Sequence, residues 1–218
     1  GIGNKIDNGM VYFTNGKIAA IGENLDIPAE ATVVDGTGKW VTPGIIDVHS
    51  HLGVYPSPST HSHSDGNEAI KPVTANVWAE HSVWPQDPGF GRALAGGVTA
   101  LQILPGSANL FGGRSVVLKN VPDRTMQEMK FPDAPYGLKM ACGENPKRVY
   151  GKKGGPSTRM GNVAGYRQAW ADAENYMRAW ERYEADYEAG KNPTPPKRDL
   201  NLDTLMGVLK DEIRVHMH

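Results

Sequence analysis

Three things that this 218-residue sequence lacks exclude several classes of protein. It has one cysteine, Cys142, so it forms neither an internal disulfide nor a zinc site built from several cysteines. No apolar run reaches the roughly 18 to 20 residues that cross a membrane as a helix, so no membrane partner is expected. Neither sign of charge dominates, since 23 basic and 24 acidic residues give a net charge of −1. A nucleic-acid partner is therefore not expected either.

The composition of the sequence is typical of a folded protein. Hydrophobic residues make up 39% of the sequence, which is enough for the core of one large domain. The single cysteine agrees with a reducing, cytoplasmic compartment, and a periplasmic one stays open because the amino-terminus reads as cut. The carboxy-terminus also reads as cut, because "DEIRVHMH" stops inside an apolar strand. We therefore expect a fragment of a longer protein, and leave open whether it is a monomer or a homo-oligomer.

The first 43 residues predict β structure. The stretch 10–22 alternates apolar and polar residues around Asn15-Gly16, a dipeptide whose easy positive φ suits a two-residue hairpin turn. The stretch 31–44 predicts a further strand and a glycine-rich turn.

From Gly44 onward the pattern changes to short, continuous apolar runs. Such runs are typical of strands buried on both faces, as in a parallel sheet covered by helices. They occupy residues 45–51, 98–106, 115–120, 137–143 and 213–218. Between the last two runs, residues 160–190 keep helical spacing and end at Gly190, a Pro-rich connector follows, and residues 200–212 predict a second helix. The order of strands and helices predicts an α/β barrel or an open α/β sheet.

Two histidines stand at the end of the first buried run. Residues two apart on an extended strand point to the same side, so His49 and His51 face one point. In a parallel barrel the ends of the strands form the face where active sites are built. Two neutral imidazoles aimed at one point are half of a divalent metal site, typically zinc. Asp47, on the same side of the strand, is placed to orient an imidazole.

The run "VTPGIIDVHSHLG", residues 41–53, resembles the first barrel strand of the amidohydrolase superfamily. This superfamily of metal-dependent hydrolases includes dihydroorotase, imidazolonepropionase and isoaspartyl dipeptidase. The preceding residues 15–44 resemble its small β-sandwich domain, and residues 96–109 and 137–151 are similar to segments of the imidazolonepropionase-like subgroup. The resemblance implies an α/β fold, a partial TIM-type (β/α)8 barrel. About five of its strands would lie in residues 44–218, preceded by residues 1–43 as part of the β-sandwich domain.

The resemblance also implies the metal ligands. His49 and His51 match the pair on the first strand of the family. The family places a carboxylated lysine or a glutamate at the end of the fourth strand, which Lys139 or Glu144 matches. Lys139 is favoured as the catalytic and metal-bridging group, because a lysine inside an apolar strand needs a reason. The alternative for Lys139 is a side chain that reaches to the surface, and Glu144 could instead cap a turn.

The last strand supplies further candidates. His216 matches the histidine that ends the fifth strand of the family, and His218 is then a neighbouring or accessory contact. Asn109 and Arg114, beyond the second and third strands, are candidate substrate contacts. The resemblance implies one or two divalent ions, zinc or a similar metal, and a small-molecule substrate.

The implied function is hydrolysis of amide, cyclic amide or related C–N bonds by a water that the metal activates. Two rivals stay open: deamination or phosphoester hydrolysis on the same scaffold, and an inactive fragment or non-catalytic metal-binding relative. The family's sixth-strand histidine and its eighth-strand aspartate, the general base, have no counterpart before His218. We therefore expect this chain alone to bind a divalent ion weakly or not at all and to be inactive.

The remaining histidines have less support as site residues. His61 and His63 lie in a segment rich in Ser and Pro that reads as a solvated loop, with a role in substrate or metal entry as the alternative. His81 has no paired partner nearby in the sequence and is expected to be ordinary.

Overall fold

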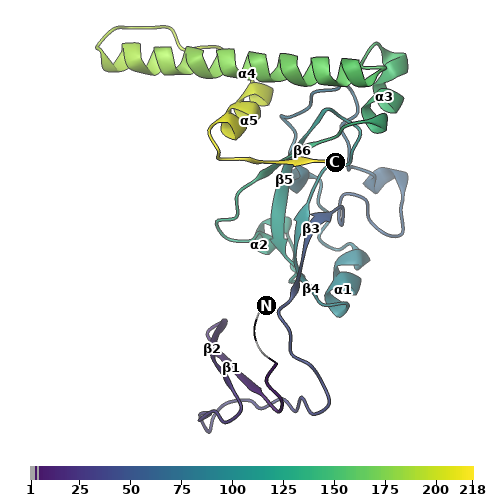
Figure 1. Ribbon diagram of the computed structural model, residues 1–218, viewed down its shortest axis with the longest axis vertical. Coiled ribbons are helices and arrows are strands. Elements are labelled where there is room, and N and C mark those ends of the chain that lie inside the picture. Colours follow the sequence, from purple (N-terminus) through teal and green to yellow (C-terminus); the bar gives the residue numbers. More distant parts are fainter. Residues whose placement is uncertain (1–2, 4) are drawn as a thin grey trace. The chain divides into compact units, whose positions relative to one another are not determined.

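The computed structural model describes residue 3 and residues 5–218 of the chain (Figure 1). The chain divides into two compact units, Gly1–Pro43 and Gly44–His218.

The first unit contains the expected hairpin. Strands β1 (Met10–Thr14) and β2 (Lys17–Gly22) pair antiparallel. The turn between them uses Asn15 and Gly16 with φ of 51° and 72°, the left-handed values that this dipeptide favours. The strand expected within residues 31–44 is absent, since these residues form loop and turn. A strand needs a neighbour to satisfy its backbone groups, and no other strand pairs with this segment in the described part of the unit.

The second unit is built on a five-stranded sheet with the order β3-β4-β5-β6-β7. Its strands are β3 (Ile45–Ser50), β4 (Val98–Ile103), β5 (Phe111–Lys119), β6 (Gly137–Met140) and β7 (Arg214–Met217). All five apolar runs therefore form strands, as predicted. The parallel sheet that the runs predicted holds for the pairs β3–β4 and β6–β7 and is wrong for β5, which runs antiparallel to both β4 and β6. The connection from β4 to β5 is too short for the crossover that a parallel pair requires.

The sheet curls so that its two ends approach each other. His49 lies on β3 and His218 directly follows β7, at opposite ends of the strand order, yet their ring centroids are 4.8 Å apart. The fold is thus a mixed α/β fold with a curled, half-barrel sheet.

Five α-helices and three short 3₁₀ turns are described in this second unit. They are α1 (Pro88–Ala95), α2 (Met126–Met129), α3 (Glu144–Tyr150), α4 (Arg159–Glu188) and α5 (Leu200–Leu209), with the short 3₁₀ turns η1 (His61–His63), η2 (Ala79–His81) and η3 (Gly151–Lys153). The two predicted helices are α4 and α5, and Figure 1 shows them side by side next to the sheet. Gly190 follows α4 with φ of 74°, in agreement with the predicted stop. Among the described residues, no helix combines the length and the apolar character needed to cross a bilayer.

Two apolar clusters cover one face of the sheet. Phe90 of α1 packs with Leu101 and Ile103 of β4, and Leu205 of α5 packs with Leu138 of β6. Side chains alternate along a strand, so the residues between these core positions point to the opposite face. That face, called the polar face below, carries Asp47, His49, His51, Gln102, Ser115, Gly137, Lys139, His216 and His218.

Truncating one core side chain measures how much the helix packing stabilises this sheet. Leu205 is fully buried, and we expect Leu205→Ala to lower the free energy of unfolding by about 2 to 5 kcal/mol. Urea unfolding followed by circular dichroism measures this change. Leu200→Ala, at a position 59% exposed on the same helix, is the control and should change stability by less than about 0.5 kcal/mol. Equal effects of the two substitutions would contradict the packing described here.

Candidate metal centre

Three imidazoles meet on the polar face. The rings of His49 and His51 have centroids 5.2 Å apart and are nearly perpendicular, and His218 approaches His49 from the other end of the sheet. The two rings of the first pair therefore share one side of β3, as their spacing predicts. The Asp47 carboxylate accepts the backbone N–H of His49 at 3.0 Å, and among the described residues no hydrogen bond joins it to either ring.

The protonation of His51 is fixed by a backbone carbonyl. Its Nδ1 lies 2.8 Å from the oxygen of Leu104, just after β4. A carbonyl oxygen only accepts hydrogen bonds, so Nδ1 carries the proton and Nε2 keeps a free lone pair. Burial lowers the pKa of His51, which favours the neutral ring at neutral pH. A histidine held in this way is the usual form of a metal ligand.

Lys139 of β6 reaches the same place from inside the sheet. Its side chain has no exposed surface, and its Nζ lies 3.0 Å from the Pro105 carbonyl oxygen and 3.4 Å from His49 Nε2. Desolvation lowers the pKa of Lys139 to about 8. The alternative that Lys139 reaches to the surface is therefore wrong.

Glu144, the other candidate for the carboxylate position, lies elsewhere. It is the first residue of α3, its side chain is 64% exposed, and it forms an ion pair with Arg148 at 3.3 Å. Of the two candidates, the structure brings Lys139 to the histidines and leaves Glu144 on the surface of a helix.

The two histidines of the last strand lie in different surroundings. His218 contacts His49, and its Nδ1 is 2.9 Å from the Ser107 hydroxyl oxygen. The Nε2 atom of His216 instead lies 3.1 Å from the side-chain amide of Gln102. His218, expected to be the accessory residue, is thus the one in ring contact with the first-strand pair. Burial lowers the pKa values of both His49 and His216.

Asn109 holds a loop in the structure. It is 1% exposed, and its amide group donates to the backbone oxygens of Glu68 and Lys71 at 2.8 and 3.1 Å and to Thr74 Oγ1 at 2.9 Å. These bonds occupy the group that was expected to contact substrate.

Arg114 points away from the histidines. It precedes Ser115 on β5, so its side chain lies on the opposite face of the sheet. The guanidinium group lies 4.4 Å from the Trp78 ring centroid, and its Nε donates to Thr204 Oγ1 at 2.9 Å. Arg114 therefore packs between the sheet and α5, outside the candidate centre.

The other histidines are at the surface, as expected for ordinary residues. The 3₁₀ turn His61–His63 is exposed, with the His63 ring against Trp84 at 4.7 Å. His81 is likewise exposed and stacks on Trp78.

The donors on the polar face suit a divalent ion in kind, since imidazoles whose pKa values are lowered offer lone pairs at neutral pH. They do not form a closed site. Within the described part of the chain, no three His, Cys, Asp or Glu side chains are spaced to hold a metal ion together. The residues thus fit an open site of two imidazoles, His49 and His51, with Lys139 beside them.

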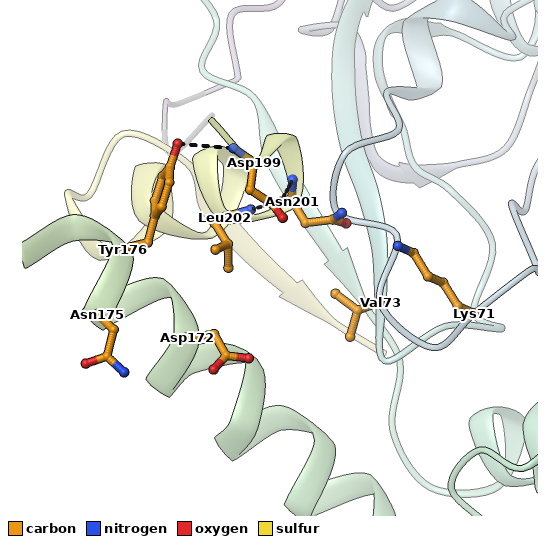
Figure 2. Close-up of a pocket in the computed structure, with 8 residues that line it drawn as sticks. All are labelled: Lys71, Val73, Asp172, Asn175, Tyr176, Asp199, Asn201 and Leu202. Atoms are coloured by element: carbon orange, nitrogen blue, oxygen red, sulfur yellow. Dashed lines mark hydrogen bonds between the residues drawn. The ribbon is translucent and has the colours of Figure 1, made fainter. Parts of the chain in front are cut away.

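A hollow of about 530 Å³ lies outside this centre (Figure 2). Its lining comes from α4, the start of α5 and a loop after β3: Lys71, Val73, Asp172, Asn175, Tyr176, Asp199, Asn201 and Leu202. Asp199 accepts the backbone N–H groups of Asn201 and Leu202 and so caps α5. Tyr176 donates to Asp203 at 2.8 Å. These groups hold the two helices together, which gives the hollow a structural explanation.

Several residues that shape the centre were not predicted from sequence. The carbonyls of Leu104 and Pro105 bind His51 and Lys139, and the Ser107 hydroxyl binds His218. The one signal for them is Pro105, which ends the apolar run of β4 and predicts that the chain leaves the sheet with free carbonyls.

Comparison with known proteins finds relatives that are named amidohydrolase and imidazolonepropionase, although no family model matches the chain. It is 31% identical over 226 residues to the protein named Amidohydrolase tasK of Hapsidospora irregularis, covering 98% of this chain and 23% of that protein. It is 47% identical over 54 residues to an imidazolonepropionase of Geobacillus sp. (strain WCH70), covering 22% of this chain and 13% of that protein.

Among solved structures, the crystal structure of an amidohydrolase from Thermotoga maritima MSB8 matches with a TM-score of 0.85 and 44% identity. The match covers 95% of this chain and 52% of that one. The chain therefore spans about half of this structure and about a quarter or less of the two curated relatives.

Proposed function

Because the chain belongs to the amidohydrolase superfamily, we propose that it carries the metal-binding face of a hydrolase that cleaves amide, cyclic amide or related C–N bonds. The cofactor would be one or two divalent ions, zinc or a similar metal, and the substrate a small molecule. One observation carries the proposal. His49 on β3, His51 directly after β3 and the buried Lys139 on β6 meet on one face of the curled sheet.

The roles of the chain's own residues follow from their contacts. The Leu104 carbonyl keeps the proton of His51 on Nδ1, so that Nε2 faces the centre with its lone pair. The side chain of Lys139 is directed at His49 by the Pro105 carbonyl. His49 and His51, with Lys139 beside them, would hold a divalent ion, whose chemistry there would be that of a Lewis acid toward the scissile carbonyl or C=N group and a water molecule.

Lys139 is the residue proposed for the family's carboxylated lysine. An amine adds to CO2 only through its neutral form, giving a carbamate and releasing a proton. With a pKa of about 8, a fraction of Lys139 is neutral near pH 7, whereas an exposed lysine is almost fully charged. The carbamate would supply oxygen ligands, and its negative charge would offset that of a cation.

Hydrolysis also requires a base that takes a proton from the attacking water, a contribution of roughly 10²- to 10⁴-fold. Asp47 is the carboxylate nearest to the histidine pair in sequence, and the backbone N–H of His49 engages it. We therefore propose that the described residues place no carboxylate base at the centre and that the chain alone turns over no substrate.

The test is an assay of this chain beside the longest natural protein that contains it. The substrates are N-acyl amino acids, dipeptides, cyclic amides, aminopurines and phosphoesters. Zinc-dependent amide or cyclic-amide cleavage by the longer protein, lost with a chelator and in the His51→Ala variant, is the expected result. Turnover of phosphoesters alone, or turnover that survives His51→Ala, would refute the proposed reaction. Comparable turnover by this chain would refute the proposal that it lacks the base.

A further inference from the structure

A chain of polar contacts crosses four strands on the polar face, next to the candidate centre. The side-chain amide of Gln102 on β4 lies 2.7 Å from Ser115 Oγ on β5 and 3.1 Å from His216 Nε2 on β7. The backbone N–H of Gly137, on β6, donates to the same Ser115 oxygen at 2.9 Å. Ser115 is 1% exposed and Gln102 is 9% exposed, so the contacts are largely shielded from water.

Gly137 shows how closely these side chains converge. A Cβ atom at this position would lie 2.5 Å from Ser115 Oγ, 2.6 Å from His216 Cδ2 and 2.8 Å from the Gln102 amide nitrogen. All three distances are shorter than real Cβ contacts. The polar side chains therefore fill the space that any other residue would need, and glycine at this point of β6 is what allows Gln102 to reach His216.

Counting hydrogens determines which end of the Gln102 amide faces the other two residues. The Ser115 oxygen already accepts the Gly137 N–H, so its own hydrogen needs an acceptor. If the NH2 group of Gln102 faces Ser115, the buried hydroxyl hydrogen finds none among its contacts in the described residues. A half-turn of the amide puts its oxygen in the same position, where it accepts from the Ser115 hydroxyl.

The same half-turn defines the protonation of His216. An amide oxygen facing His216 Nε2 requires that this nitrogen carry the hydrogen, which leaves Nδ1 with the free lone pair of the neutral ring. The outer atom of the Gln102 amide is not among the buried polar atoms without a partner, so water can satisfy the NH2 group in its new position. The Ser115 hydroxyl, the Gly137 N–H and the His216 Nε2–H then each have a partner.

We propose that Gln102 is a positioning residue, whose amide oxygen, held by Ser115 over Gly137, keeps His216 in the Nε2–H form and so presents Nδ1 as its donor atom. His51, by contrast, is held at Nδ1 by a carbonyl and presents Nε2. This inference rests on the proposed function and adds to it, because it assigns to the hydrolase a residue that selects the donor atom of one of its histidines.

The test reads the tautomer directly, in the absence of metal and substrate. Nitrogen-15 NMR of the chain labelled in histidine, at a pH where the rings are neutral, distinguishes Nε2–H from Nδ1–H for each ring. We expect Nε2–H for His216 in the natural sequence and Nδ1–H for His51, which serves as the internal reference. Nδ1–H for His216 would show that the NH2 group faces it and would overturn the proposal.

Substitutions assign the effect to Gln102. Gln102→Glu keeps an acceptor and should retain the Nε2–H form, whereas Gln102→Leu should lose the preference and give a mixture. The His51 signal should stay unchanged in both. Gln102→Asn, which withdraws the amide by one methylene, replaces the leucine variant if that variant does not fold. An unchanged His216 tautomer in the Leu or Asn variant would overturn the role of Gln102. Absence of zinc-dependent hydrolysis in the longer protein, with the tautomers as expected, would refute the proposed reaction and leave the positioning contact intact.

Discussion

Replacing Lys139 with methionine should raise the free energy of unfolding at pH 7 by up to about 3 kcal/mol, the equivalent of the shift in its pKa from 10.5 to about 8. The amine has no exposed surface, and two neutral acceptors provide its hydrogen bonds. Burying the charged form is therefore unfavourable. Methionine has a similar length and no charge, so it would fill the space without this penalty.

The pH dependence gives the sign of this effect. The folded chain releases the Lys139 proton near pH 8 and the unfolded chain near pH 10.5, so between these values the unfolded state binds more protons. The free energy of unfolding of the natural chain therefore decreases as the pH falls from 10.5 through 8. Above pH 10.5 Lys139 is neutral in both states and its burial carries no such penalty. Urea unfolding at a series of pH values should show Lys139→Met gaining most below pH 8 and nothing above 10.5.

A matched control separates this effect from a general change of charge. Lys152 is exposed on a 3₁₀ turn, and Lys152→Met should change stability by less than about 0.5 kcal/mol at every pH. A difference between Lys139→Met and the natural sequence that did not vary with pH would show that Lys139 is not desolvated. A residue retained at such a cost in stability is expected to serve function, which agrees with its place beside the histidines.

Replacing His51 with alanine should weaken zinc binding by at least about 100-fold. Loss of a residue that only orients a metal ligand weakens metal binding by roughly 10- to 100-fold. Loss of the ligand itself should weaken binding by more than this. Competition with a chromogenic chelator measures the dissociation constants, including the weak binding expected of this chain. His63→Ala, at an exposed histidine of η1, is the control and should leave the affinity unchanged.

The pH profile of zinc binding tests the same assignment. Protons compete with a metal for imidazole only below the pKa of the ring. Because burial lowers the pKa values of His49 and His51 from 6.5, binding should persist to a lower pH than binding by an exposed histidine pair. Equal affinity in the His51→Ala and His63→Ala variants would show that zinc binds elsewhere.

Local patterns in the sequence predicted the elements well. Asn15-Gly16 forms the hairpin turn, the predicted helix of residues 160–190 is α4, and each continuous apolar run forms a strand. The resemblance of residues 41–53 to the amidohydrolase superfamily is confirmed by the similar proteins and by the similar structure. These features depend on residues close together in the chain, which is why sequence alone indicates them.

Features that depend on pairing between distant strands were predicted less well. The direction of β5 is set by its short connection to β4, and its register decides that Ser115 faces the histidines while Arg114 faces α5. The apolar composition of a strand contains neither piece of information. Likewise, Gln102 looks like an ordinary strand residue until His216 of β7 meets it across the two intervening strands, β5 and β6.

The central claim is that His49 and His51 bind a divalent ion on the polar face, beside Lys139. Anomalous diffraction at the zinc edge, from crystals of this chain soaked in zinc, locates the ion directly. A peak about 2.0 to 2.1 Å from nitrogen atoms of both His49 and His51 is the predicted result. Zinc found only at other positions, such as the exposed His61–His63 turn, with none at His51, would contradict the account.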